Sequence, residues 1–194
     1  MITDYDFHGK LLKVFNEAAF SPPRHWCLSP HLWHSVDNMS SEVEVLEFMY
    51  GIIRCMQPEF VVETGTYKGL GALAIGKALE ANGHGRLFST EIHVPYIQTA
   101  RELCKGLPVD IVEMSSLDYA PDRDIDFAWF DSEPAIRADE FRKYYPRLTG
   151  LVGFHDTYFN EVWNGIKDLE REGLIIPIVF KTPRGMCLAQ VVHP

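Results

Sequence analysis

Hydrophobic positions along the chain alternate between short continuous runs and stretches with helical spacing. The continuous runs predict strands over Phe60–Glu63, Leu87–Glu91, Val109–Glu113, Ile125–Phe130 and Leu151–His155. Between and after them, the spacing predicts helices over Gly69–Ala81, Pro95–Lys105, Arg137–Tyr145 and Glu161–Glu172. Strands that are apolar almost throughout are typical of a parallel sheet buried on both faces.

The two ends of the chain depart from this alternation. Near the N-terminus, Ser41 and Glu44 have the spacing of a capping box before an apolar stripe, which predicts a helix over Ser41–Met56. Near the C-terminus, the apolar runs LIIPIVF and MCLAQVV flank the turn KTPRG, so the sheet closes with a hairpin. We therefore expect an α/β fold with a Rossmann-like, seven-stranded, mostly parallel sheet, helices on both faces and an antiparallel last strand.

Length and composition favour one folded domain. The chain has 194 residues, of which 46% are hydrophobic and 12% are aromatic, enough for a sizeable core. We expect a single domain over 1–194, with a helical and loop cap over 1–55 and a cofactor-binding α/β core over 56–194.

Net charge limits the expected classes of partner, and cysteine spacing indicates the expected redox state and compartment. Eighteen Lys and Arg against 27 Asp and Glu give a net charge of −9, and no basic stripe is present, so neither nucleic acid nor a membrane surface is an expected partner. No apolar segment approaches the ~20 residues of a membrane span, and the N-terminus begins MITDYDFHGK, unlike a signal peptide. The four cysteines lack CxxC spacing and are expected to be reduced thiols in a cytoplasmic protein.

A glycine-rich loop follows the first predicted strand, within the stretch VVETGTYKGLGALAIGKAL. In an open α/β sheet, ligands bind at the carboxyl ends of the strands near the switch in strand order, which places Thr64–Gly71 on the binding edge. Gly65 allows a tight turn out of the strand, and Gly69 allows a ligand or a helix to approach the backbone closely.

Two cofactor classes compete for this loop. The residues TGTYKGLG match the TGxxxGxG pattern of short-chain dehydrogenases, and Glu91 could bind ribose hydroxyls in NAD as readily as in S-adenosylmethionine (SAM). However, no YxxxK motif occurs in the chain, and the loop starts late for a dehydrogenase of this length.

Glu63 gives a physical reason to prefer SAM. An ionised carboxylate at the end of the first strand would repel the pyrophosphate of a dinucleotide in a partly desolvated crevice. The amino and sulfonium groups of SAM are cations that it would attract. A strand-end ion pair between Glu63 and Lys68 is the structural alternative.

Four short motifs in order now suggest a family. They are ETGTYKG at 63–69, STE at 89–91, WFD at 129–131 and GFHDT at 153–157. From Ser41 onward the chain resembles a class I SAM-dependent methyltransferase, and within that class the small-molecule O-methyltransferases of the catechol type. The resemblance implies transfer of a methyl group from SAM to a small-molecule acceptor, with a hydroxyl as the expected acceptor group.

The resemblance also implies roles for individual residues in cofactor binding. Together with Glu63, Gly65, Tyr67 and Gly69 would surround the methionine part of SAM. Glu91 would bind the ribose hydroxyls. Ser115 would contact the adenine edge, unless it and its neighbour only form a polar turn.

Three residues at strand ends are candidates for catalysis and metal binding. Asp131, His155 and Asp156 are expected at one rim of the cleft, where they could activate the acceptor. Catechol-type relatives bind Mg²⁺ there, which implies Asp131 and Asp156 as oxygen ligands. This chain has Thr157 where those relatives have Asn, and Pro134 where they have Lys.

His155 offers an alternative to a metal. Its unperturbed pKa lies near neutral pH, so it could act as the general base. A structural role is equally open, with His155 paired to Asp156 and Asp156 capping the following helix.

The residues that bind the methyl acceptor are the hardest to predict from the sequence. The segment PPRHWCLSPHLWH has no clean period, and we expect a loop whose Trp26, Trp33 and His34 contact an aromatic or sugar substrate, unless these rings only pack in the protein. Two further functions remain open: an NAD(P)-binding oxidoreductase, and a SAM-binding protein without turnover. Nothing in the sequence indicates the oligomeric state.

Overall fold

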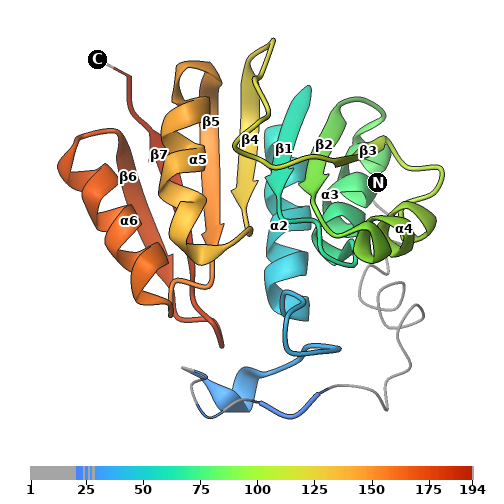
Figure 1. Ribbon diagram of the computed structural model, residues 1–194, viewed down its shortest axis with the longest axis horizontal. Coiled ribbons are helices and arrows are strands. Elements are labelled where there is room, and N and C mark those ends of the chain that lie inside the picture. The colour runs from blue at the N-terminus through green and yellow to red at the C-terminus, as the bar shows by residue number, and fades with distance from the viewer. Residues whose placement is uncertain (1–20, 24, 26, 28, 194) are drawn as a thin grey trace.

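A computed structural model describes residues 21–23, 25, 27 and 29–193, and it shows one sheet with helices on both faces (Figure 1). The strands are β1 (Phe60–Thr64), β2 (Arg86–Glu91), β3 (Val109–Glu113), β4 (Ile125–Phe130), β5 (Leu148–His155), β6 (Ile175–Phe180) and β7 (Met186–Val191). The α-helices are α2 (Val43–Met56), α3 (Leu70–Asn82), α4 (Val94–Leu103), α5 (Arg137–Tyr144) and α6 (Asn160–Arg171). Short 3₁₀-helices cover η2 (Pro30–Leu32), η3 (Pro134–Ile136) and η4 (Tyr145–Arg147).

The sheet has seven strands in the order β3-β2-β1-β4-β5-β7-β6. Strands β1 to β5 pair in parallel, and β7 is antiparallel to both β5 and β6. The expected fold class, including the antiparallel last strand, is confirmed. Because the chain passes from β1 outward to β2 and β3 and then returns to β4, the carboxyl ends of β1 and β4 border the switch point of the sheet.

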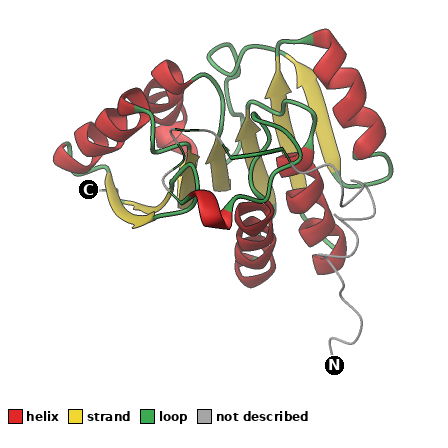
Figure 2. Cartoon of the chain, turned by 90° about the horizontal axis from the view of Figure 1, so that it is seen from below, coloured by secondary structure: helices red, strands yellow, loops and turns green. Residues whose placement is uncertain are grey.

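Most strands divide their apolar side chains between two cores. On β1, Val61 faces the layer of α2, α3 and α4, whereas Phe60 and Val62 face the layer of α5 and α6. Figure 2 shows these helices on opposite sides of the sheet. Period-two alternation with both faces apolar is the reason that the strands read as continuous hydrophobic runs.

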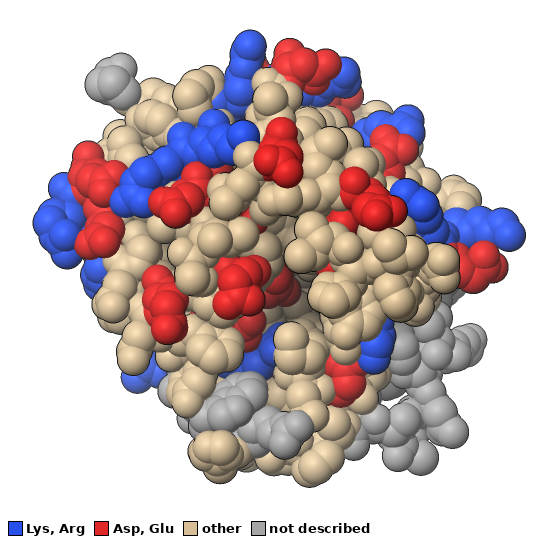
Figure 3. All heavy atoms as spheres, in the orientation of Figure 1, with Lys and Arg blue, Asp and Glu red and all other residues tan. Residues whose placement is uncertain are grey.

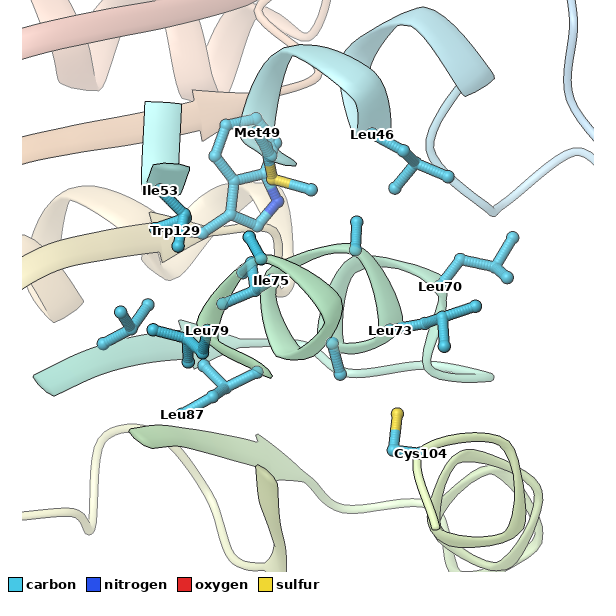
Figure 4. Close-up of a cluster of buried hydrophobic side chains, with 14 of the residues drawn as sticks. Leu46, Met49, Ile53, Leu70, Leu73, Ile75, Leu79, Leu87, Cys104 and Trp129 are labelled. Carbon is cyan, nitrogen blue, oxygen red and sulfur yellow. The ribbon is translucent and has the colours of Figure 1, made fainter. Parts of the chain in front are cut away.

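Helix α2 belongs to the first of these cores. Its Leu46, Met49 and Ile53 are buried with residues of α3 and with Trp129 of β4 (Figure 4). Packing therefore joins this predicted cap helix to the sheet, and the loop segment before α2 is the part that crosses the carboxyl edge of the strands.

The predicted capping box of α2 is wrong. The helix begins at Val43, and no side chain caps it. The Ser41 hydroxyl instead donates to Asp131 (Oγ–Oδ2, 3.1 Å), and the Glu44 carboxylate lies 2.6 Å from His34 Nδ1. Both polar groups of the expected box are engaged by partners outside the helix, so local spacing alone misassigned them.

Strand β5 begins at Leu148, three residues before the predicted start at Leu151. Leu148 pairs with Ile125, and the register shifts between Ile125 and Phe127. A Cβ at Gly150 would collide with the Asp126 carbonyl. This close approach requires a glycine at this position inside the strand.

The hairpin between β6 and β7 forms as predicted. The Gly185 N–H donates to the Thr182 carbonyl at 3.0 Å, which closes a four-residue turn with Pro183 in second place. Gly185 has a φ of +75°, a conformation that a glycine adopts without strain.

Two further expectations concern cysteines and membrane spans. The four cysteines are free, and Cys104 and Cys187 are buried. Among the helices that the structure describes, none has both the length and the apolar character needed to cross a membrane.

Candidate active site

The loop after β1 turns sharply across the end of β4. The N–H groups of Gly65 and Thr66 donate to the Thr90 carbonyl at 3.0 and 3.1 Å, and Gly65 has a φ of +80°. A Cβ at Gly65 would lie 2.5 Å from the Asp131 carbonyl oxygen. Gly65 is therefore required both for the turn and for the close approach of the loop to the backbone before Ser132.

Gly69 serves helix packing. It precedes α3 with a φ of +94°, and a Cβ there would lie 2.8 Å from Ala100 of α4. A Cβ at Gly71 would collide with the Glu63 carboxylate. Of the two uses expected for Gly69, the structure thus shows the close approach of a helix.

Glu63 is buried beneath this loop. Ser89 donates a hydrogen bond to its carboxylate (Oγ–Oε2, 2.5 Å), and Ser89 in turn contacts the Thr66 hydroxyl. Burial raises the pKa of Glu63 to about 8; the Ser89 hydrogen bond opposes this rise, and the nearby charges of Asp131 and Glu91 add to it. The expectation of an ionised Glu63 is wrong for the ligand-free protein, because a carboxyl with this pKa is mainly neutral at pH 7.

Glu91 lies at the end of β2 and holds two loops together. Its Oε2 accepts the Tyr67 N–H at 2.7 Å, and its Oε1 accepts the N–H groups of Ile92 and His93 at 2.8 and 2.9 Å. Tyr67 has a φ of +49°, which is uncommon for a residue with a side chain. An ionised carboxylate offers about four acceptor positions, so the Glu91 carboxylate can accept one more hydroxyl.

Ser115 follows β3 and is half-buried. Its carbonyl accepts the Asp118 N–H at 2.9 Å. This contact forms the polar turn that the sequence offered as the alternative to adenine binding, and it leaves the adenine role a prediction.

A buried carboxyl that sequence reasoning missed lies behind Ser115. Glu140 of α5 accepts hydrogen bonds from Thr64 (2.9 Å), Ser132 (2.6 Å) and Ser116. Burial raises the pKa of Glu140, against the lowering effect of these hydroxyls. The signal was the set of hydroxyl residues at three strand ends, which need a common acceptor if they are buried.

The structure brings the three candidate catalytic residues together. Ligand atoms of Asp131, His155 and Asp156 all lie within 4.8 Å of one another. The Asp131 side chain is 15% exposed, whereas His155 is fully buried. Of the three, Asp131 is therefore the residue best placed to touch an acceptor.

Both ring nitrogens of His155 face carboxylates. Nε2 lies 2.8 Å from Glu42 Oε2, and Nδ1 lies 3.1 Å from Asp131 Oδ1. Burial and the charge of Arg184, whose Nη2 lies 3.3 Å from Nδ1, would lower the pKa of His155, but the charges of Asp131, Asp156 and Glu42 outweigh them and raise the pKa to about 10. A raised pKa favours the protonated ring, which disfavours His155 as the general base, and its catalytic role stays a prediction.

The alternative role for Asp156 is also wrong in detail. Helix α6 begins at Asn160, and Phe159 precedes it as the cap residue without a side-chain hydrogen bond. Asp156 itself has a φ of +56°, and its carbonyl accepts the Phe159 N–H at 2.9 Å. Its carboxylate lies against Arg137 and Arg184.

Two arginines reach this cluster, Arg137 from the start of α5 and Arg184 from the turn between β6 and β7. Arg137 Nη2 lies 3.4 Å from Asp131 Oδ1 and 3.3 Å from Asp156 Oδ2. Arg184 Nε lies 3.1 Å from Asp156 Oδ1 and 3.6 Å from Glu42 Oε2. The side chains of both arginines are almost fully buried.

Sequence reasoning missed Arg137, Arg184 and Glu42. The turn KTPRG was interpreted only as a reversal, although β6 runs parallel to β5 and so ends at the same edge of the sheet. That topology was the available signal for Arg184. The sequence contains no such signal for Glu42, because its partner His155 is far away in the chain.

A divalent cation does not fit this donor set. The carboxylate oxygens lie close enough to hold an ion, and oxygen ligands suit Mg²⁺. However, Asp131 and Asp156 already face the guanidinium of Arg137, and Asp156 also faces that of Arg184. The implied Mg²⁺ would have to share its ligands with two permanent cations.

The segment before α2 lies against both halves of the site. Asp37 accepts a hydrogen bond from Lys68 of the glycine loop (2.9 Å), and the Lys68 and Ser40 contacts among others lower its pKa although burial opposes them. Arg184 donates to the carbonyls of Asn38 and Met39 at 3.3 and 3.2 Å. This segment thus connects the glycine loop to the acidic cluster.

The predicted substrate residues have different surroundings from one another. Trp33 is buried, and its Nε1 donates to the Ser21 carbonyl at 2.8 Å. His34 forms an exposed pair with Glu44. Trp26 lies outside the described residues. Packing within the protein, the alternative offered for these rings, agrees with the position of Trp33.

Acidic side chains predominate around the middle of one face of the molecule. Figure 3 shows a face that is hollowed near its middle, with acidic side chains around the hollow and Lys and Arg mostly toward the rim. The excess of acidic residues over the whole chain, at a net charge of −9, has the same sign.

The solved structures that are similar to this chain agree with one another on its fold. No family model and no curated protein matches the sequence. Among solved structures, the SAH-bound methyltransferase PaMTH1 of Podospora anserina has a TM-score of 0.72 at 14% identity, over 100% of this chain and 99% of that one. The SAH complex of the Bacillus cereus O-methyltransferase has a TM-score of 0.71 at 15% identity, over 99% and 93%.

A third structure is similar over a smaller part of the chain. The O-methyltransferase TomG of Streptomyces achromogenes, which is involved in tomaymycin synthesis, was solved with SAM and has a TM-score of 0.68 at 15% identity. The match covers 81% of this chain and 84% of that one. Together with the strand order, these likenesses establish that the chain has the fold of the class I SAM-dependent O-methyltransferases.

Proposed function

We propose that this protein is a SAM-dependent methyltransferase that methylates a hydroxyl group of a small molecule. One observation carries the proposal. Glu63 and Glu91 lie at the carboxyl ends of the neighbouring strands β1 and β2, of which β1 borders the switch point of the sheet, and the Tyr67 N–H of the glycine loop donates to the Glu91 carboxylate. This is where an open α/β sheet binds its ligand.

The residues of this loop suit SAM in distinct ways. Glu91 has an acceptor position left for a ribose hydroxyl. Glu63 is neutral in the free protein and can lose its proton when the cationic methionine part of SAM approaches, because a nearby positive charge lowers the pKa of a carboxyl. Gly65, Tyr67 and Gly69 shape the loop, and Ser115 remains the candidate for the adenine edge.

Bound SAM supplies a methyl group on a positively charged sulfur, from which an oxygen lone pair displaces a neutral thioether as the oxygen–carbon bond forms. The protein must align the acceptor and exclude water. Asp131 is the partly exposed carboxylate at the rim, and we assign it to accept the hydrogen bond of the acceptor hydroxyl and then its proton.

The environment of Asp131 indicates the kind of hydroxyl. Burial alone would raise the pKa of Asp131, but His155, Arg137 and Arg184 lower it. A carboxylate with a lowered pKa is a weak base, so it takes a proton most readily from an acidic hydroxyl or after charge has developed in the transition state. Phenol-like acceptors are therefore favoured over sugar hydroxyls.

The oxidoreductase alternative is not favoured. The common dinucleotide-binding sheet has the strand order 3-2-1-4-5-6, whereas here the antiparallel β7 lies between β5 and β6. A SAM-binding protein without turnover shares the fold, and a methyl-transfer assay separates it from an enzyme.

Isothermal titration calorimetry with SAM, S-adenosylhomocysteine and NAD(P)H tests the proposal. We expect binding of the first two and none of the third. Glu91→Ala should weaken SAM binding by at least about tenfold, the effect of losing a hydrogen bond to a charged group. Glu113→Ala is the matched control, because Glu113 ends β3 directly opposite Glu91 and is exposed. Equal affinities of both variants would refute the assignment.

Activity requires a separate assay with pooled phenols, sugars and amines. Formation of S-adenosylhomocysteine with phenols supports the proposal, and binding without turnover for any acceptor favours the inactive alternative. A cytoplasmic location remains part of the proposal, supported by the free state of all four cysteines.

A further inference from the structure

We propose that Arg137 and Arg184 take the place of a divalent cation beside Asp131, so that methyl transfer by this protein does not depend on a metal. This inference rests on the proposed function. It concerns positioning residues, because both arginines act through Asp131 and Asp156 and neither is open to an acceptor.

The first step is the placement of Arg137. Its Nε donates to the Ser132 carbonyl at 2.8 Å, and its Nη1 donates to the His155 carbonyl at 2.5 Å. Nη2 contacts both Asp131 and Asp156. The guanidinium is thus fixed from the ends of β4 and β5 at once and bridges the same two carboxylates that the family resemblance assigns to Mg²⁺.

The second step is the placement of Arg184. Its backbone N–H donates to Glu42 Oε1 at 2.9 Å, and its guanidinium binds the carbonyls of Asn38 and Met39. Nε lies 3.1 Å from Asp156 Oδ1, an ion-pair distance without the geometry of a hydrogen bond. The turn between β6 and β7 and the segment before α2 therefore hold this cation in place from two sides.

The third step is the charge balance. Asp131 and Asp156 carry two negative charges, and the two guanidiniums that face them carry two positive charges. Glu42 lies against His155 and Arg184 and adds no unpaired carboxylate. A divalent cation would enter a site that is already neutral and would lie within a few ångströms of two like charges.

The consequence concerns Asp131. Its Oδ1 faces Arg137 and His155, and its Oδ2 accepts only the Ser41 hydroxyl at 3.1 Å among the contacts of the described residues. Oδ2 keeps an acceptor position for the substrate hydroxyl. The arginines thus fix the orientation of the carboxylate that a metal would otherwise position.

Metal binding by the whole chain is the direct test. We expect no Mn²⁺ binding by electron paramagnetic resonance, and no shift of the melting temperature with Mg²⁺, with or without SAM. Methyl transfer and SAM affinity should be unchanged by EDTA. The variant Arg184→Ala leaves the carboxylates with an excess negative charge, so we expect it to bind Mn²⁺ at least about tenfold more tightly than the detection limit at which the wild type shows no binding.

Arg142→Ala is the control variant. Arg142 pairs with Glu172 at the surface (Nη2–Oε1, 2.6 Å), so its loss should create no metal site. If Arg184→Ala does not fold, the wild-type measurements still decide the question. Mn²⁺ binding by the wild type, or loss of activity with EDTA while SAM still binds, would overturn the inference.

Failure of the proposed function gives a different result. In that case SAM either does not bind the wild type or binds without methyl transfer to any acceptor, with or without metal. The resonance and melting experiments on the free chain then still report whether the arginines exclude a cation.

Discussion

His155 and Glu42 form an ion pair that is closed to solvent on both sides, with Nε2 and Oε2 at 2.8 Å. The two residues are 113 positions apart in the chain. Their contact fastens the segment before α2 to the end of β5. Because each charge is compensated only by groups inside the protein, the pair has direct consequences for stability.

Removal of one partner should be costly. We expect His155→Gln and Glu42→Gln each to lower the free energy of unfolding by about 3 to 5 kcal/mol, since the remaining charge stays buried without its partner. Urea denaturation of both single variants and the double variant measures the coupling between them. The control is His34→Gln at the exposed pair with Glu44, for which about 1 kcal/mol or less is expected. Additive effects of the two buried changes would contradict a direct pair.

The same pair predicts how stability depends on pH. The pKa of His155 is raised to about 10 in the folded protein, above its ordinary value of about 6.5. Its contribution to stability is therefore complete below pH 6.5 and is lost as the pH rises toward 10. Chemical denaturation at several values between pH 6.5 and 10 should show this loss. A wild-type profile as flat as that of His155→Gln over this range would show that the imidazole is neutral.

Glu63 predicts a proton released on cofactor binding. Its pKa of about 8 means that the carboxyl is mainly protonated at pH 7, and a cationic ligand should lower that pKa below 7. Calorimetric titration with SAM in buffers of different ionisation enthalpy should reveal the release of close to one proton. Glu63→Gln keeps the shape of the side chain and should bind SAM without this release. Buffer-independent heats for the wild type would show that Glu63 does not face the ligand charge.

Gly65 and Gly83 separate the effect of backbone conformation from that of steric fit. Both have positive φ, +80° and +78°, but a Cβ at Gly83 meets nothing within 4 Å, whereas one at Gly65 meets the Asp131 backbone. Gly83→Ala should cost about 1 kcal/mol of stability. Gly65→Ala should cost more and should also weaken SAM binding, as thermal denaturation and calorimetry would measure. Equal costs would mean that the loop can move away from Asp131.

Much of the fold could be predicted from the sequence because it depends on local patterns. The apolar runs of the five parallel strands and the turn at Pro183 and Gly185 identified the elements and the closing hairpin. The predictions were wrong where a residue makes a tertiary contact instead of the local one that its spacing suggests. The Ser41 hydroxyl donates to Asp131 instead of capping α2, and β5 begins three residues before its predicted start, at Leu148.

The candidate site likewise has one part that the sequence predicted and another that it did not. The sequence alone placed Glu63, Glu91, Asp131 and Asp156 at strand ends, because the carboxyl ends of parallel strands share one edge. It could not assign their charges, since a pKa depends on burial and on neighbours that come from elsewhere in the chain.

Only the tertiary structure decided what surrounds these carboxylates. It buried Glu63 and placed His155 between Glu42 and Asp131. It also brought Arg137 from the start of α5 and Arg184 from the turn between β6 and β7 to the position where family resemblance implies a metal. The physical reason is that hydrophobic periodicity is a property of neighbours in the sequence, whereas a balance of buried charges is a property of neighbours in space.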